Sequence, residues 1–123
     1  MVKVNFNGAL FNSEQKSRIE VVICDTQGAV LASLSKVLRR TYSPFEVEGM
    51  AVASALQLAL NFVFQEVILE GDCQVLMHVL KHDSPFLSPD GIILDAVRSQ
   101  ARCFNKLHYS YVNKEMVICL LMV

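Results

Sequence analysis

The chain has 123 residues, of which 53% are hydrophobic and 19% charged, and its formal net charge at pH 7 is −1. This length indicates one domain with a buried core, and the balanced charge excludes a global positive field, so nucleic-acid binding would need a local basic patch. The four cysteines are irregularly spaced and no signal peptide or membrane span is recognisable, so we expect an intracellular protein of the cytoplasm or nucleus, without a zinc site or disulfide framework.

The first forty residues predict three strands. Residues 2–6 alternate apolar with polar side chains and end at Asn7-Gly8, a dipeptide typical of tight turns, and a polar loop follows at residues 12–18. The apolar residues 19–24 and 29–34 flank a second turn signal, Asp25-Thr26-Gln27-Gly28. We therefore predict a hairpin of the second and third strands, with the first strand paired beside it.

Helical and strand patterns alternate in the rest of the chain. Ser43, Pro44 and Glu46 form a capping-box signature that begins a helix with apolar side chains at helical spacing to about Asn61. The later segments are a buried strand at 67–70, a helix from Asp72 to about 82, a loop around 84–91, a helix at 92–104 and a strand at 105–112. This order, β-β-β-α-β-α-α-β, predicts a mixed α/β (α+β) sheet with helices on both faces.

Three polar side chains are predicted to meet where two of these strands end. Asn7 follows the first strand, Asp72 the fourth, and Glu48 lies one turn into the first helix. Asp72 either caps the next helix or lies at the strand end, where open α/β sheets place their chemistry, and Asn7 serves either the Asn-Gly turn or the same site. In a sheet ordered 3-2-1-4 the three converge, and such oxygen ligands suit a pair of magnesium ions about 3.5–4 Å apart.

Three sequence strings resemble the leading motifs of the ribonuclease H superfamily: Val4-Asn5-Phe6-Asn7-Gly8-Ala9, Glu46-Val47-Glu48-Gly49-Met50-Ala51 and Val67-Ile68-Leu69-Glu70-Gly71-Asp72. The closest resemblance is to the plant-type domain that is often retroelement-derived, and it covers about residues 3 to 115. It implies a five-stranded sheet of order 3-2-1-4-5 with helices on both faces. It also implies metal-dependent hydrolysis of the RNA strand of RNA–DNA hybrids, with Mg²⁺ or Mn²⁺ and without a small-molecule cofactor or a membrane.

The resemblance carries catalytic and metal-binding roles to specific positions. The family uses an Asp, a Glu, an Asp and a later Asp, so Glu48 and Asp72 match the second and third, whereas Asn7 stands in the position of the first. The fourth acid is expected on a C-terminal helix, but after Glu115 only eight apolar residues follow. We thus expect a ribonuclease H-like domain at 1–115 and a divergent apolar tail at 116–123, with the final helix missing from a C-terminally truncated chain.

The sequence departs from the family pattern at one more place, and it contains basic residues that could contact nucleic acid. Arg18-Ile19-Glu20 replaces the family's Gly-x-Gly, which lets the sheet approach its ligand closely. The basic residues that could contact phosphates, or form a solvated strand end, are Lys36, Arg39 and Arg40. The function is therefore either an impaired hybrid-cleaving ribonuclease or a catalytically inactive nucleic-acid-binding or truncated module.

Two histidines offer a separate candidate. His78 and His82 are four residues apart on one helix face, as zinc ligands can be, and they equally suit the cationic end of a helix.

Overall fold

The computed structural model describes residues 1–40, 42–82 and 91–112, apart from the side chains of residue 12 and residues 91–93. The helices and strands are β1 (Val2–Phe11), the 3₁₀ helix η1 (Asn12–Glu14), β2 (Lys16–Cys24), β3 (Val30–Leu38), α1 (Pro44–Asn61), β4 (Glu66–Gly71), α2 (Gln74–Lys81), α3 (Gly91–Ala101) and β5 (Lys106–Tyr111). Most of the loop predicted around residues 84–91, the expected absence of a final helix and the predicted tail at 116–123 lie outside the described residues.

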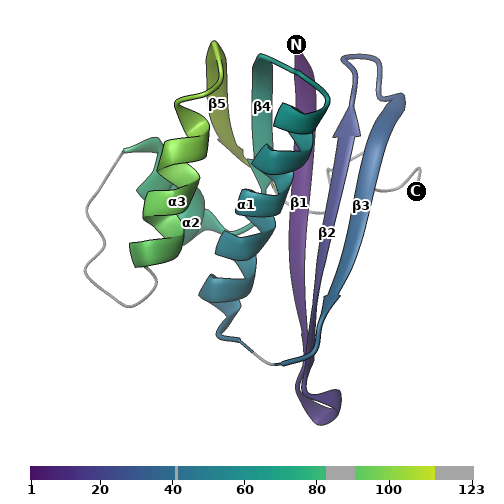
Figure 1. Cartoon of the computed structure of the whole chain (residues 1–123), viewed down its shortest axis with the longest axis vertical. Helices are drawn as coiled ribbons and strands as arrows, with labels where there is room; N and C mark the ends of the chain where they lie inside the picture. Colours follow the sequence, from purple (N-terminus) through teal and green to yellow (C-terminus); the bar gives the residue numbers. More distant parts are fainter. Residues whose placement is uncertain (41, 83–90, 113–123) are drawn as a thin grey trace.

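The five strands form one sheet in the order β3-β2-β1-β4-β5, which confirms the predicted order. β1, β2 and β3 are antiparallel neighbours, whereas β4 runs parallel to β1 and β5 runs parallel to β4 (Figure 1). The sheet is therefore mixed, and its two halves meet between β1 and β4.

One face of the sheet carries the core. Val4 and Phe6 of β1 and Leu69 of β4 are buried there with apolar residues of β2 and of all three helices. Six buried apolar or small side chains of α1 pack on this face, namely Val47, Ala51, Val52, Ala55, Leu56 and Ala59. The abundant alanine lets α1 lie close to the strands, as its sequence indicates.

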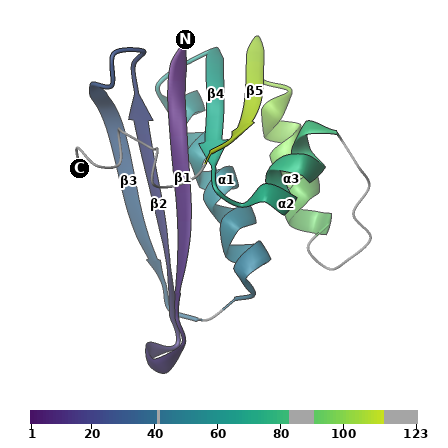
Figure 2. The same cartoon turned by 180° about the vertical axis from the view of Figure 1, so that it is seen from behind.

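The second face of the sheet has no described helix over it, although helices on both faces were expected. From behind, the strands lie in front of α1, and α2 and α3 lie to the side of β4 and β5 (Figure 2). The alternation of the strands turns the side chains of Lys3, Asn5 and Glu70 to this second face. Val22, Cys24 and Val112 form a small apolar cluster there. None of the helices in the described ranges is long and apolar enough to cross a membrane.

The hairpin of β1 and β2 is longer than the sequence pattern predicts. β1 does not end at Asn7-Gly8 but continues to Phe11, and its pairing with β2 extends from Lys3↔Cys24 to Phe11↔Lys16. The turn lies instead at η1 and at Gln15, which has a φ of 52°. The Asn-Gly turn is therefore wrong as a prediction, because strand pairing overrides the local turn preference. Likewise β3 continues to Leu38, so Lys36 is inside a strand.

Both ends of α1 have defined caps. At the start, the Ser43 hydroxyl accepts the Glu46 N–H at 3.1 Å and the Glu46 carboxylate accepts the Ser43 N–H at 3.1 Å, which confirms the predicted capping box. At the end, the Phe64 N–H donates to the Ala59 carbonyl at 3.0 Å and the Val63 N–H to the Leu60 carbonyl at 2.9 Å. This is a Schellman motif, and Val63 occupies its left-handed position with a φ of 61°.

Gly71, the last residue of β4, lies against the ring of Phe6 on the neighbouring strand β1. A Cβ atom at residue 71 would overlap the Phe6 ring, which is itself 2% exposed. The sequence pattern marks Gly71 as the residue that breaks the strand, whereas it is the last strand residue and makes room for an aromatic ring.

Candidate functional site

Glu48 is fixed at the middle of β1 by a backbone hydrogen bond. Its Oε1 atom accepts the N–H of Gly8 at 3.2 Å, and the side chain is partly buried. Gly8 permits this approach because a Cβ atom there would lie 2.5 Å from the Cγ1 atom of Val47 and 3.3 Å from Oε1 of Glu48. The N-terminal part of α1 therefore holds the Glu48 carboxylate against Gly8, the residue that follows Asn7.

Asn7 and Asp72 lie level with each other at the junction of β1 and β4. The last parallel pair between these strands is Asn5↔Glu70, and Asn7 and Asp72 each lie two residues beyond it. Phe6 and Gly8 face α1, so the alternation of β1 turns Asn7 to the second face of the sheet. We call the region of Asn7, Glu48 and Asp72, where β1 and β4 meet, the corner. Glu48 thus reaches the corner from the helix side, whereas Asn7 projects from the opposite side of β1.

Asp72 is not the cap of α2. This helix begins at Gln74 with Cys73 as its N-cap, and no side-chain hydrogen bond closes that cap. The capping interpretation of Asp72 is therefore wrong, because the chain needs one more residue to turn from β4 into the helix. Asp72 is left in the β4–α2 connection, at the carboxyl end of β4.

The thiol of Cys73 is affected by the carboxylates of both Glu48 and Asp72. Burial raises the pKa of Cys73, and the negative charges of Glu48 and Asp72 raise it further, against the lowering effect of backbone N–H groups at the start of α2. Glu48 and Asp72 consequently act on one thiol from two different elements. The sequence gives no sign of this role for Cys73, since it depends on how α1 and α2 pack.

Glu20 is a residue that the sequence pattern did not indicate as part of this corner. It lies directly opposite Asn7 in the β1–β2 register, at a position where side chains of neighbouring strands interact. Its carboxylate is 3.9 Å from the guanidinium of Arg18, in a partly exposed ion pair. The side chains that replace the family's Gly-x-Gly thus place a paired acid beside Asn7.

The oxygen ligands at the corner can hold fewer metal ions than the two that the family resemblance implies. Glu48 and Asp72 supply two carboxylates, and Asn7 offers only a neutral amide oxygen. Within the described ranges, no three His, Cys, Asp or Glu side chains come together as metal ligands. One hydrated Mg²⁺ can be held by one or two carboxylates, whereas a pair of ions needs bridging acids that these residues do not provide.

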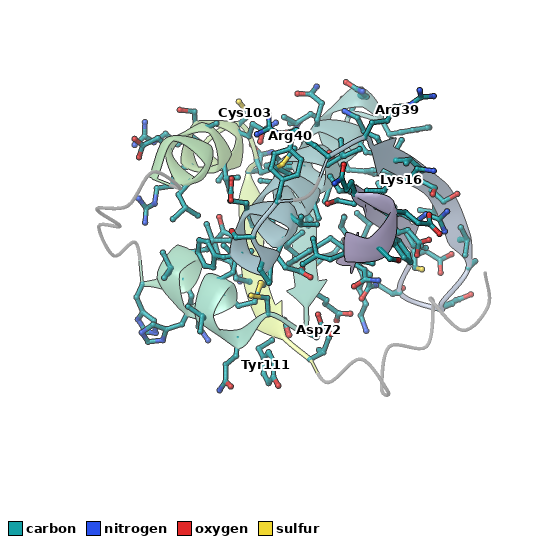
Figure 3. The ribbon with its side chains drawn as sticks, turned by 90° about the horizontal axis from the view of Figure 1, so that it is seen from below. Lys16, Arg39, Arg40, Asp72, Cys103 and Tyr111 are labelled. Atoms are coloured by element: carbon teal, nitrogen blue, oxygen red, sulfur yellow. The ribbon has the colours of Figure 1, made fainter. Side chains whose placement is uncertain are left out.

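Two of the predicted basic residues, Arg39 and Arg40, lie at the edge of the molecule away from Asp72 in the end view of Figure 3. Arg39 and Arg40 follow β3, and the Arg40 guanidinium lies 4.8 Å from the ring centroid of Tyr42. Lys16, which the sequence analysis did not single out, lies beside them (Figure 3). Lys36 is exposed on β3, where it pairs with Ile19. These cations form a basic end, defined here as Lys16, Arg39 and Arg40, that the net charge of the chain does not reveal.

His78 and His82 lie close together at the end of α2. Their ring centroids are 4.3 Å apart with a tilt of 46° between the rings. Both side chains are exposed, and within the described chain no third His, Cys, Asp or Glu completes a metal site with them.

The chain matches a known protein family. Residues 5–119 match the family model described as Reverse transcriptase-like. The comparison with curated proteins gave no match.

Solved structures resemble the chain over most of its length. RNase H1 from the halophilic archaeon Halobacterium salinarum has a TM-score of 0.85 and 21% identity, over 94% of this chain and 88% of that one. The N-terminal RNase H domain of rv2228c from Mycobacterium tuberculosis has a TM-score of 0.84 and 15% identity, over 94% and 84%. LC11-RNase H1, isolated from compost and solved in complex with an RNA/DNA hybrid, has a TM-score of 0.82 and 17% identity, over 94% and 87%. The chain belongs to the Reverse transcriptase-like family and has the ribonuclease H-like fold.

Proposed function

We propose that this chain is a nucleic-acid-binding ribonuclease H-like domain whose hydrolysis of RNA–DNA hybrids is weak or lost. The observation that carries the proposal is Asn7, a neutral residue at the level of Asp72 with Glu48 held beside it at Gly8. Two-metal hydrolysis needs both ions held on the attacking and leaving oxygens. Glu48 and Asp72 are carboxylates for at most one such ion, since the Glu20 carboxylate is paired with Arg18. We therefore expect nucleic-acid binding to persist although hydrolysis does not.

The nucleic-acid part of the proposal rests on the basic end. Lys16, Arg39 and Arg40 lie at the edge of the end view away from Asp72 (Figure 3), and Lys36 lies on β3 opposite Ile19. Recognition of a hybrid depends on backbone and 2′-hydroxyl contacts, for which exposed lysine and arginine are suited. LC11-RNase H1, of the same fold, binds an RNA/DNA hybrid in its structure. The assignment to the plant-type, retroelement-derived branch rests on the sequence motifs and is part of the same proposal.

A second candidate function is a slow but genuine metal-dependent ribonuclease. The observation in its favour is that Glu48 and Asp72 remain close enough for both to act on Cys73. One bound ion can still polarise a phosphate and orient water, although it does not clamp both oxygens.

A cleavage and binding assay separates the two. The purified chain is incubated with a labelled RNA–DNA hybrid in Mg²⁺ and in Mn²⁺, and binding of the same hybrid is measured at several salt concentrations. We expect salt-sensitive binding and negligible cleavage. Metal-dependent cleavage that disappears in Asp72→Asn supports the slow enzyme instead.

A matched pair of variants tests the binding surface. Arg39→Gln/Arg40→Gln removes two charges from the basic end, and Arg102→Gln/Lys106→Gln removes two from the opposite end, where β5 begins. We expect the first pair to weaken binding and to reduce the slope of log K against log salt by roughly 1–2, the value for one or two lost phosphate contacts. Equal effects of both pairs would show that the basic end is not the binding surface.

A further inference from the structure

A polar groove of about 380 Å³ lies between α2 and β5, outside the corner of Glu48 and Asp72. It is lined from α2 by Gln74, Met77, His78, Lys81 and His82, and from β5 by Tyr109, Ser110 and Tyr111. Each of its polar side chains can donate a hydrogen bond, and no Asp or Glu is among these lining residues. This composition suits an anion.

Two histidines, His78 and His82, line the groove. Imidazole side chains change their charge between about pH 5 and pH 8. His78 and His82 face the groove with Lys81 from α2, and the titratable groups opposite them are the hydroxyls of Tyr109 and Tyr111. Two imidazolium rings 4.3 Å apart beside an ammonium group repel one another, and a bound anion relieves this repulsion.

The groove begins where the corner ends. Gln74, at its near end, is two residues beyond Asp72, and Tyr111 is paired with Gly71 across the β4–β5 register. In the end view, Asp72 and Tyr111 lie side by side at the same edge of the molecule (Figure 3). A nucleic-acid backbone that passes the corner therefore has its next phosphates within reach of the groove, because phosphates repeat along the strand at short intervals.

We propose that the groove between α2 and β5 binds a phosphate group of the nucleic acid, through His78, Lys81 and His82, more tightly when the two histidines are protonated. This inference rests on the proposed nucleic-acid binding and adds a site and a pH dependence to it. Chelation of a transition metal by the two imidazoles is the competing use of this pair. The described residues offer no third His, Cys, Asp or Glu ligand for it, whereas the donors of the groove fit a phosphate oxygen.

Hybrid binding is measured by fluorescence anisotropy at pH 6.0 and pH 7.5, with a chelator present so that no transition metal bridges the histidines. The chain has three histidines, and His108, exposed on β5 outside the groove lining, supplies the control. For the parent and for His108→Gln we expect binding at pH 6.0 to be roughly threefold to fivefold tighter, the upper part of the range for one exposed ion pair. For His78→Gln/His82→Gln we expect this tightening between pH 7.5 and pH 6.0 to disappear. Tightening that survives in the double variant, or that disappears in His108→Gln, overturns the inference.

A second measurement separates this inference from the proposed function. Inorganic phosphate is titrated at pH 6.0 while the imidazole proton signals are followed by NMR. We expect the signals of His78 and His82 to shift and the signal of His108 to remain in place. If the hybrid does not bind but phosphate shifts these two signals, the proposed function fails and the groove remains an anion site. If phosphate shifts none of them and hybrid binding shows no pH dependence, the groove is not a phosphate site.

Discussion

At the scale of single residues, Gly71 and Phe6 leave no room for a side chain at residue 71. The Phe6 ring occupies the volume that a methyl group at residue 71 would need, and the ring is buried. A buried ring cannot withdraw without moving its neighbours, because protein interiors are close-packed.

We predict that Gly71→Ala lowers the free energy of unfolding by about 1–3 kcal/mol, the usual cost of overpacking a core. Urea unfolding monitored by circular dichroism measures this change. Phe6→Leu serves as the partner variant in a double-mutant cycle, because a smaller side chain leaves room for the methyl group. If the two changes are simply additive, the ring is not the cause of the loss.

The corner shows at the same scale why sequence reasoning reaches only part of a site. Glu48 and Asp72 match family motifs that can be read directly from the sequence, because the matches depend only on the order of residues along the chain. The pairing of Glu20 with Asn7 depends on the β1–β2 register, and that register was obscured because Asn7-Gly8 resembles a turn. Cys73 is likewise invisible in the sequence, since its surroundings come from two helices that pack together.

At the scale of the elements, the end of α1 carries a residue poorly suited to its backbone. Val63 has a φ of 61° and its side chain is 73% exposed, so no burial offsets the steric cost. Glycine is the usual residue at this position of a Schellman motif, and a β-branched residue is the least suited to it.

Val63→Gly should therefore stabilise the protein. Left-handed backbone costs an L-residue roughly 1–2 kcal/mol, and the greater freedom of glycine in the unfolded chain offsets part of the gain, which leaves about 0.5–1 kcal/mol. The midpoint of urea unfolding measures the gain. Val63→Ala is the control, because alanine removes the branch but keeps the Cβ atom. An alanine variant as stable as the glycine variant would show that exposed apolar surface, and not backbone conformation, is responsible.

The elements that could be predicted best were those with local signals of their own. The capping box of α1 and the glycine turn after β2 are short-range features, and Gly28 has the expected positive φ of 87°. The lengths of β1 and β3 could not be predicted, because their outer halves are set by pairing between strands. The groove between α2 and β5 also has no local signature, since its walls come from elements separated by α3.

At the scale of the whole molecule, the corner joins both halves of the sheet to the first helix, so its charge affects global stability. Asn7 lies between Glu20 on β2 and Asp72 beyond β4, with Glu48 entering from α1. A carboxylate at position 7 would lie beside Glu20 and level with Asp72, and like charges at short distance raise one another's pKa and destabilise the folded state.

We therefore expect Asn7→Asp to melt at a lower temperature than the parent in the absence of metal and to gain more stability from Mn²⁺. Hard cations prefer anionic oxygen ligands, and an ion at a hundredfold excess over its dissociation constant adds roughly 2.7 kcal/mol to the folded state. Thermal melts with and without Mn²⁺ measure the difference. Adding Asp72→Asn should abolish the extra gain. An equal metal-induced shift in the parent and in Asn7→Asp would mean that the corner does not act as one site.

The order of the strands also has a consequence for the chain while it is being synthesised. β1, β2 and β3 are complete once Leu38 has been made, and hairpins form within microseconds, yet β4 ends only at Gly71. At ~5–20 residues per second, translation leaves the parallel edge of β1 without its neighbour for a few seconds. During this interval Lys3 at that edge discourages pairing with foreign strands, as charged edge residues do. Asp72 follows Gly71, the last residue of β4, which pairs with this edge of β1. A nascent chain therefore contains four of the five strands before Asp72, the last residue of the corner, has been synthesised.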